Sequence, residues 1–243
     1  MTDSAEPMLP HLLSREMLSS GRLEAMVARA MPSVRLLTPA ERDASLHATL
    51  AAHPEPGDAV WLFGYGSLIW NPTVHVAEER RAHVAGWHRA FCLTASAGRG
   101  TAACPGLLLG LLRGGACSGM ALRVAPEAVV DELALLWRRE MLANSYVPAW
   151  VEVAGDDGAR FGHAIAFTIN PDSAQFAGNL HEDEVVRRLA TASGELGSCA
   201  EYLFRTCDGL RALGLTDPAI EHLAARVRRR MDAEMDQPSP LPL

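Results

Sequence analysis

The order of the expected secondary-structure elements is the sequence feature that most constrains the fold of this chain. From residue 60 onward, short runs of strand-forming residues are separated by turns that contain glycine or proline. The expected strands cover 60–65, 83–95, 105–113, 116–124, 148–154 and 161–169. One helix over 126–144 interrupts them, and helices near 182–193, 198–212 and 217–234 follow. Since strands and helices do not alternate regularly, the sequence predicts an α+β fold with a curved or closed mixed β-sheet (a small barrel) and flanking helices, and not a Rossmann-type sheet.

The chain divides into three parts by composition. Residues 1–56 are predicted to be a helical N-terminal extension that ends in a linker, because 53–58 contains two prolines and a glycine. Residues 57–236 hold the strands and are predicted to form one domain, which is large enough to bury a single core. The proline-rich end, 237–243, is expected to be disordered.

Two helices are expected in the extension, from about Ser14 to Ala30 and from Thr38 to Ala52. The second has a strong start signal. Thr38 can cap the helix, Pro39 suits its first position, and Glu41 lies three residues after the cap.

The most informative segment is 60–72, where an apolar strand ends abruptly in the small-residue turn Gly64-Tyr65-Gly66-Ser67. Glycines at such a point let backbone N–H groups approach a ligand closely, and a carboxylate or a developing oxyanion suits those groups. Gly66 is expected to be required because a side chain would intrude on the ligand or because its φ is positive. A tight turn after a buried strand is the alternative reading of a Gly-x-Gly pattern taken by itself.

A second signal lies on the helix expected over 126–144. At about 100° per residue, Glu140 falls in the middle of an apolar stripe, and Arg138 lies almost opposite. The stripe consists of Val129, Leu133, Leu136 and Trp137. A carboxyl group that faces a core is costly unless it is paired or functional, and burial raises its pKa toward neutral pH. The pattern alone leaves open a catalytic base and a buried Glu–Arg pair.

Composition narrows the chemistry further. All 22 basic residues are arginines, which excludes Schiff-base lysines, a pyridoxal-phosphate anchor and a P-loop lysine. Five cysteines occur without a Cys-x-x-Cys pair and nine histidines without a His-x-x-x-His pair, so neither a disulfide framework nor a metal site is predicted. Cys199 and Cys207 are expected to be small buried apolar residues.

Charge and hydropathy indicate the surroundings of the protein. The net charge of −7 disfavours nucleic acid and anionic membranes as partners. The sequence has no run of about 18 apolar residues that would span a membrane. Residues 1–10 carry acids and lack the pattern of a signal peptide, so a cytoplasmic location is expected. The sequence leaves the oligomeric state open.

Several of these motifs together resemble the γ-glutamylcyclotransferases, and in particular their ChaC-type branch, which cleaves glutathione. Phe63 to Leu68, followed by Ile69-Trp70-Asn71-Pro72, is similar to the Tyr-Gly-Ser-Leu loop of that family. Leu136 to Met141 and Tyr146 to Trp150 resemble the segment that holds the family's catalytic glutamate. Further matching segments are Gly86 to Phe91, Gly98 to Thr101, Pro105 to Leu107, Gly114 to Gly119, Ile169 to Pro171 and Cys199 to Leu203. The resemblance covers roughly 60–230, so the N-terminal 56 residues have no counterpart in the compact members.

The resemblance implies a γ-glutamylcyclotransferase-like fold and a set of site residues. Glu140 is implied as the catalytic residue. The implied substrate-binding residues are Gly64, Tyr65, Gly66, Ser67, Leu68, Ile69, Tyr146, Tyr202 and Arg99. For two of these residues the sequence also fits a role outside the site. Tyr146 could fill the edge of the core, and Arg99 could be a solvated loop residue.

The implied activity is the cleavage of glutathione into 5-oxoproline and Cys-Gly, without metal or organic cofactor. The substrate's own α-amino group attacks its γ-carbonyl, which agrees with the lack of a Gly-x-Ser-x-Gly pattern around Ser67. Two alternatives remain open from the sequence. One is a general γ-glutamyl-amino-acid cyclotransferase, and the other is a non-catalytic ligand-binding regulator linked to cation transport.

Overall fold

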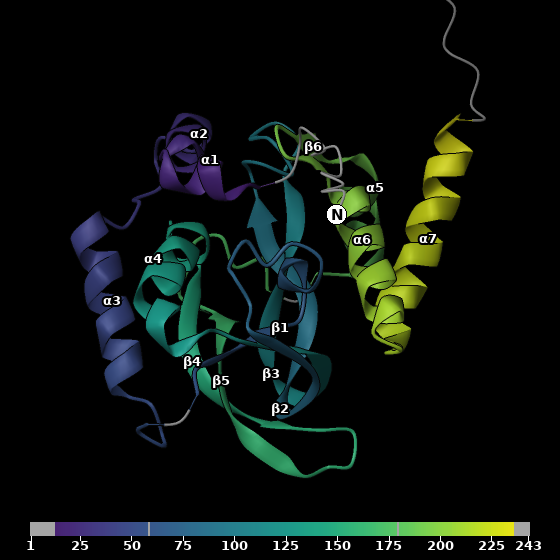
Figure 1. Cartoon of the computed structure of the whole chain (residues 1–243). Helices are drawn as coiled ribbons and strands as arrows, with labels where there is room; N and C mark the ends of the chain where they lie inside the picture. The colour runs from purple at the N-terminus through teal and green to yellow at the C-terminus, as the bar shows by residue number, and fades with distance from the viewer. Residues whose placement is uncertain (1–12, 58, 179, 236–243) are drawn as a thin grey trace, which may run out of the picture.

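The computed structural model describes residues 13–57, 59–178 and 180–235. Five strands form a closed barrel in the order β1-β3-β2-β4-β5 (Figure 1). They are β1 (Trp61–Gly64), β2 (Glu78–Ala95), β3 (Gly106–Arg123), β4 (Tyr146–Ala154) and β5 (Arg160–Ile169). Neighbouring strands are mostly antiparallel, whereas β5 pairs in parallel with β1 and with β3. The predicted α+β class with a small closed mixed sheet is therefore confirmed.

The prediction of two strands over 105–113 and 116–124 is wrong, because β3 runs through both without a break. Gly114 and Gly115 have φ values of 102° and 69°, and they lie opposite Gly86, whose φ is 77°. The register between β2 and β3 shifts at this point. Such a bulge bends and twists a strand pair instead of ending it. The glycines thus let an 18-residue strand curl around the barrel.

The predicted helices are present, with small differences at their ends. They are α1 (Arg15–Ser19), α2 (Arg22–Ala30), α3 (Pro39–Ala51), α4 (Val129–Glu140), α5 (Glu182–Thr191), α6 (Cys199–Ala212) and α7 (Pro218–Met235). Gly21, with a φ of 73°, divides the first expected helix into α1 and α2. The capping box of α3 is confirmed, since the Thr38 side chain accepts from the Glu41 N–H and the Glu41 carboxylate accepts from the Thr38 N–H. The short hairpin of β6 (Ser193–Gly194) and β7 (Gly197–Ser198) was not predicted.

The helices surround the barrel on three sides (Figure 1). α3 and α4 lie on one side, α5, α6 and α7 lie on the other, and α1 and α2 lie over one end. Leu62 and Phe63 of β1 point to opposite faces of the sheet, as neighbouring strand residues do. Leu62 packs in one core cluster with Leu136 of α4, and Phe63 packs in another with Leu203 of α6. The strand that leads into the Tyr-Gly-Ser loop is therefore buried on both faces.

The described part of the extension packs against the rest of the fold. Leu46 of α3 is buried in the same cluster as Leu136 of α4. Trp137 Nε1 donates to Ser45 Oγ at 3.2 Å, and Trp150 Nε1 donates to a carbonyl oxygen of α3 at 2.8 Å. The extension is thus part of the folded unit, and a division after residue 56 stays a prediction from the sequence.

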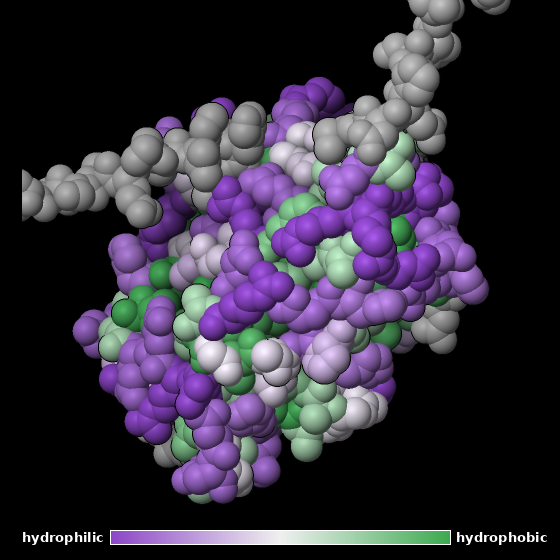
Figure 2. Space-filling model, turned by 90° about the vertical axis from the view of Figure 1, so that its right-hand side faces the viewer, coloured by the Kyte–Doolittle hydropathy of each residue, from purple (hydrophilic) through white to green (hydrophobic). Residues whose placement is uncertain are grey.

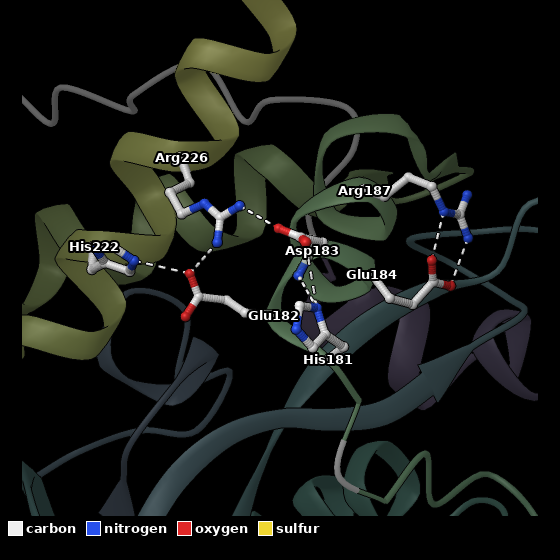
Figure 3. A network of polar contacts seen from close by, with 7 residues as sticks. All are labelled: His181, Glu182, Asp183, Glu184, Arg187, His222 and Arg226. Carbon is white, nitrogen blue, oxygen red and sulfur yellow. Dashed lines mark hydrogen bonds and ion pairs between the residues drawn. The ribbon is translucent and has the colours of Figure 1, made fainter.

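α5 and α7 are joined by exposed ion pairs (Figure 3). Arg226 of α7 pairs with Glu182 and with Asp183, the latter at 2.5 Å, and His222 Nε2 lies 2.9 Å from Glu182. Hydrogen bonds from Arg226 lower the pKa of both carboxyl groups. Exposed pairs of this kind stabilise little. The buried residues Ile220, Ala224 and Val227 are the main contacts of α7 with the core. Figure 2 views the molecule from the side on which α5, α6 and α7 lie, and this surface is largely hydrophilic with apolar residues in small patches.

Two expectations from the sequence fall on residues that the structure does not describe. They are the disordered tail at 237–243 and the lack of a signal peptide in the first ten residues. Within the ranges that are described, no helix combines the length and the apolar character needed to cross a membrane.

Candidate active site

The loop after β1 holds most of the predicted substrate-binding residues. Gly64 is the last residue of β1 and pairs with Met120 of β3. Tyr65 and Gly66 then lead into a short 3₁₀ helix, Ser67–Ile69, which was not predicted. The N–H of Ile69 donates to the carbonyl of Gly66 at 3.0 Å. Because the first N–H groups of a helix have no partner within it, this turn presents donors at its start.

The loop borders two cavities of about 20 and 180 Å³, which share Ser67, Glu140, Tyr146 and Tyr202 in their walls. The smaller one holds about one water molecule. It is lined by Tyr65, Gly66, Ser67, Leu68, Leu109, Glu140, Tyr146, Phe167 and Tyr202. Residues that lie far apart in the sequence are thus brought together around one cavity, and their contact with a substrate stays a prediction. The larger cavity extends from this point toward α2 and the segment 93–99.

Glu140 is the last residue of α4, and its side chain is 14% exposed. Burial raises the pKa of its carboxyl group above 4.5, although the Arg139 guanidinium, 2.8 Å away, opposes the rise. The negative end of the helix dipole also disfavours a charged carboxylate here. Glu140 is therefore paired with an arginine and also faces the cavity, and its role as a catalytic base stays a prediction.

Arg139 was not predicted as a site residue, yet it is the centre of the polar contacts. Its side chain is 5% exposed. It donates to Ser67 Oγ at 2.7 Å, to the Asn71 carbonyl at 2.6 Å and to Thr73 Oγ1 at 3.1 Å. The planar guanidinium can hold several acceptors at fixed angles, so one side chain joins the loop to Glu140. Its position about 100° from Glu140, on the flank of the apolar stripe, is the signal that could have indicated it.

Three phenol groups lie around Glu140. The Tyr65 hydroxyl donates to the Phe167 carbonyl at 2.6 Å, and the Tyr146 hydroxyl donates to the Leu109 carbonyl at 2.8 Å. Burial raises the pKa of Tyr65, Tyr146 and Tyr202, and the charge of Glu140 adds to this effect. The phenols are therefore neutral hydrogen-bonding groups at the cavity wall. Tyr146 is both packed at the edge of the core and part of that wall.

The position of Tyr202 explains why residue 66 is a glycine. A Cβ at this position would lie 2.8 Å from the Tyr202 hydroxyl and 3.2 Å from Leu109 Cδ1. The φ of Gly66 is −145°, so the expectation of a positive φ is wrong. The requirement for glycine comes from the space that the Tyr202 side chain occupies.

Gly64 and Ile69 were predicted to bind substrate, but they do not line either of the two cavities described above. A Cβ on Gly64 would lie 3.2 Å from Leu68 Cβ, inside the turn. The Ile69 side chain packs against Gly209 of α6. Their direct contact with a substrate stays a prediction from the resemblance, and their observed contacts support the shape of the loop.

Arg99 borders the larger cavity, and the reading of it as a solvated loop residue is wrong. It is 6% exposed and donates to Glu201 Oε2 at 2.7 Å and to the Ser198 carbonyl at 3.1 Å. Its guanidinium also lies 6.0 Å from the ring centres of Trp70 and Tyr202. The carboxylate at the start of α6 draws the arginine inward. Contact with a substrate carboxylate stays a prediction.

The cysteines of the site region are buried thiols. Cys199 and Cys207 are fully buried, as expected from the sequence. Burial raises the pKa of these thiols and of Cys92 to about 11, which makes them poor nucleophiles near neutral pH. Across the described ranges, no group of three or more His, Cys, Asp or Glu side chains is arranged to hold a metal ion.

Comparison with known protein families identifies the family of the chain. The family model described as "ChaC-like protein" matches residues 60–230. This chain belongs to the ChaC-like family. The glutathione-specific gamma-glutamylcyclotransferase of Escherichia coli strain K12 is 43% identical over 189 residues, which are 78% of this chain and 81% of that relative. Human glutathione-specific gamma-glutamylcyclotransferase 1 is 31% identical over 175 residues, which are 70% and 77% of the two chains.

A solved structure has the same fold as this ChaC-like chain. It is the crystal structure of a γ-glutamyl cyclotransferase specific to glutathione from yeast. The similarity has a TM-score of 0.65 at 22% identity and covers 71% of this chain and 97% of the yeast chain. The predicted cyclotransferase-like fold is thus confirmed.

The ChaC-like match begins at residue 60, so the extension lies outside it. The extension nevertheless reaches the larger cavity. Leu23, Met26 and Val27 of α2, together with Met31, form part of its wall. The sequence left the role of the extension open, because an apolar stripe shows that a helix is buried but not against which residues.

Proposed function

We propose that this ChaC-like protein cleaves glutathione by cyclising its γ-glutamyl group to 5-oxoproline and releasing Cys-Gly. The observation that carries the proposal is the buried Glu140 carboxyl group, which shares a small cavity with the loop Tyr65 to Leu68. The names of the E. coli and human relatives support glutathione as the substrate.

The reaction requires one bond to form and one to break. The α-amino nitrogen bonds to the γ-carbonyl carbon, the γ-amide C–N bond breaks, and two protons move from the α-ammonium group to the leaving nitrogen, which departs as the ammonium group of Cys-Gly. No enzyme nucleophile takes part. The site must fold a flexible glutamyl arm into ring-closing geometry, and such orientation can be worth about 7–11 kcal/mol.

Glu140 is the proton carrier in this proposal. It takes a proton from the α-ammonium group, since only the free amine attacks, and passes it to the leaving nitrogen. The second proton, which the attacking nitrogen loses once the new C–N bond has formed, follows the same route. A carboxyl group whose pKa is raised toward neutral pH suits both steps, and general acid–base catalysis of this kind contributes about 10²–10⁴ in rate. Arg139 binds Glu140 Oε1 and acts as a positioning residue.

The loop and the tyrosines bind the glutamyl group. Backbone N–H groups at the start of the 3₁₀ helix stabilise the negative charge that builds on the γ-carbonyl oxygen. The Tyr65 and Tyr146 hydroxyls already donate to backbone carbonyls, so their oxygen lone pairs are left to accept from the substrate's ammonium group. The substrate is thereby held with its amine facing its own carbonyl.

The proposal also covers the cellular location of the protein and its partners. Glutathione is the thiol whose redox poise characterises the cytosol, so we place the protein in the cytoplasm. The net charge of −7 argues against a nucleic acid as a partner.

The test is incubation of the purified protein with glutathione, followed by quantification of 5-oxoproline, Cys-Gly and free glutamate. We expect 5-oxoproline and Cys-Gly in equal amounts. Free glutamate in place of 5-oxoproline would indicate a hydrolase and contradict the proposal. The α-glutamyl isomer of glutathione is a matched control, because its amide cannot undergo the same ring closure.

A further inference from the structure

The larger cavity has a polar end and an apolar wall. Ser67, Arg139, Glu140, Tyr146 and Tyr202 form the polar end. The apolar wall consists mainly of Leu23, Met26, Val27, Met31, Leu142 and Leu196, which belong to or pack against one core cluster. Four of these six residues lie in the N-terminal extension, on α2 or just after it. The extension therefore contributes most of one wall of a site whose reacting groups come from the part of the chain that the family model matches.

The sequence of α2 explains why it presents an apolar face there. Leu23, Met26 and Val27 are spaced by three and four residues, so they lie on one stripe of the helix. Each is at most 7% exposed. They share a core cluster with Leu142, which follows α4, so the stripe faces the end of the helix that carries Glu140.

Polar contacts outside the cavity hold α1, the helix that directly precedes α2. Arg15 of α1 pairs with Glu132 of α4 at 2.5 Å and donates to the Thr73 carbonyl at 2.9 Å. Burial would raise the pKa of Glu132, but hydrogen bonds from Arg15 and from the His75 N–H lower it overall. The carboxylate thus stays charged and holds α1. The wall is a built part of the site and not a loosely associated segment.

The reaction chemistry determines which part of the substrate meets the wall. This step rests on the proposed function. The γ-glutamyl group must lie at Glu140, so the leaving half extends across the rest of the larger cavity. In glutathione that half offers a cysteine CH₂–SH and a terminal carboxylate. Thr94, Ser96 and Gln175 border the cavity and suit the polar part. One thiol is too small to cover six apolar side chains.

We propose that the protein also cleaves glutathione S-conjugates whose sulfur carries a short apolar group, and that the apolar wall of the larger cavity binds that group. The reaction is the same as for glutathione, and the sulfur atom takes no part in it. The α-amino nitrogen bonds to the γ-carbonyl carbon, the γ-amide bond breaks, and two protons pass from the α-ammonium group to the leaving nitrogen. The products are 5-oxoproline and the S-substituted Cys-Gly, so no oxidant or reductant is needed.

The experiment compares kcat/KM for glutathione and for its S-methyl, S-butyl and S-hexyl derivatives, with 5-oxoproline as the readout. Full burial of a methylene is worth up to about fourfold in kcat/KM. We expect S-butylglutathione to be at least tenfold better than S-methylglutathione and at least as good as glutathione. Oxidised glutathione, whose sulfur carries a charged tripeptide, is expected to react poorly.

A pair of variants tests whether α2 is responsible. Met26→Gln keeps the side-chain length but makes the wall polar. Met17→Gln is the matched control, because Met17 packs in the same cluster and is not part of the cavity wall. We expect the kcat/KM ratio of S-butylglutathione to glutathione to fall about tenfold in Met26→Gln and to stay unchanged in Met17→Gln. Both substrates are measured on one preparation, so the ratio does not depend on the folded fraction.

The outcomes separate this inference from the proposed function. Cleavage of glutathione with a tenfold or greater loss on S-butylation would overturn the inference alone. Equal ratios in the two variants would also overturn it, by removing α2 from the site. No turnover of any of these compounds would overturn the proposed function and the inference together.

Discussion

Replacing Arg139 by methionine gives a detailed test of the site geometry. The change keeps the apolar stem and removes the guanidinium from Glu140, Ser67, Asn71 and Thr73. Removal of one partner from a buried ion pair costs about 3–5 kcal/mol. With side-chain exposures of 5% and 14%, this pair is largely buried, so we expect a loss of about 3 kcal/mol in the free energy of unfolding near pH 8.

The pH dependence of the same variant has a definite sign. Because the pKa of Glu140 is raised in the folded protein, its contribution to stability is full below pH 4.5 and is lost as pH rises through the raised pKa. Without Arg139 the pKa rises further, so the stability loss is smaller at pH 5 than at pH 8. The acidic limb of the kcat/KM profile moves to higher pH, since Glu140 must be deprotonated to act.

Urea unfolding at pH 5 and pH 8, and kcat/KM measured across this range, check these expectations. Arg138→Met is the matched control, because this neighbouring arginine is exposed and donates only to the Ser19 carbonyl among the contacts described. It is expected to change stability by less than about 0.5 kcal/mol. If the two variants had the same unfolding midpoint and the same acidic limb, the role given to Arg139 would be refuted.

Three further changes test the loop and the substrate. Gly66→Ala is expected to lower kcat or raise KM at least tenfold, because its Cβ displaces the Tyr202 hydroxyl 2.8 Å away; unchanged kinetics in a folded variant would remove this contact from the site. Tyr146→Phe loses the hydrogen bond to the Leu109 carbonyl, so it should lower the free energy of unfolding in urea by about 1 kcal/mol. It should lower kcat/KM by more than this free energy accounts for; an effect on stability alone would make Tyr146 purely structural. Glutathione should have a clearly higher kcat/KM than γ-glutamyl-alanine, and equal values would point to a general cyclotransferase.

The fold and the burial of the Glu140 carboxyl group were predictable because their signals are local. The strands follow from short apolar runs and turns, and the helical period alone places Glu140 on a buried stripe. Gly114 and Gly115 show the limit of this reasoning. Two glycines in a strand fit a turn and a bulge equally well, and only the pairing with β2 decides between them.

The parts of the site that were missed depend on contacts between distant residues. Arg139 is recognisable only from its bonds to Ser67 and Thr73, which lie 72 and 66 residues away in the sequence. Arg99 is buried because Glu201, 102 residues away, accepts from it. The apolar stripe of α2 predicts burial, but most of the other residues that line the cavity lie beyond residue 66. A single sequence does not show which residues far apart in the chain come into contact.

The most direct test of the central claim is turnover of glutathione by Glu140→Gln. The substitution is isosteric and removes the proton acceptor, so we expect 5-oxoproline production to fall about 10²–10⁴-fold with the fold intact by circular dichroism. Glu127→Gln, an exposed position just before α4, is the matched control and should keep normal turnover. A folded Glu140→Gln variant that retained more than about a tenth of wild-type activity would contradict the assignment of Glu140 as the catalytic base.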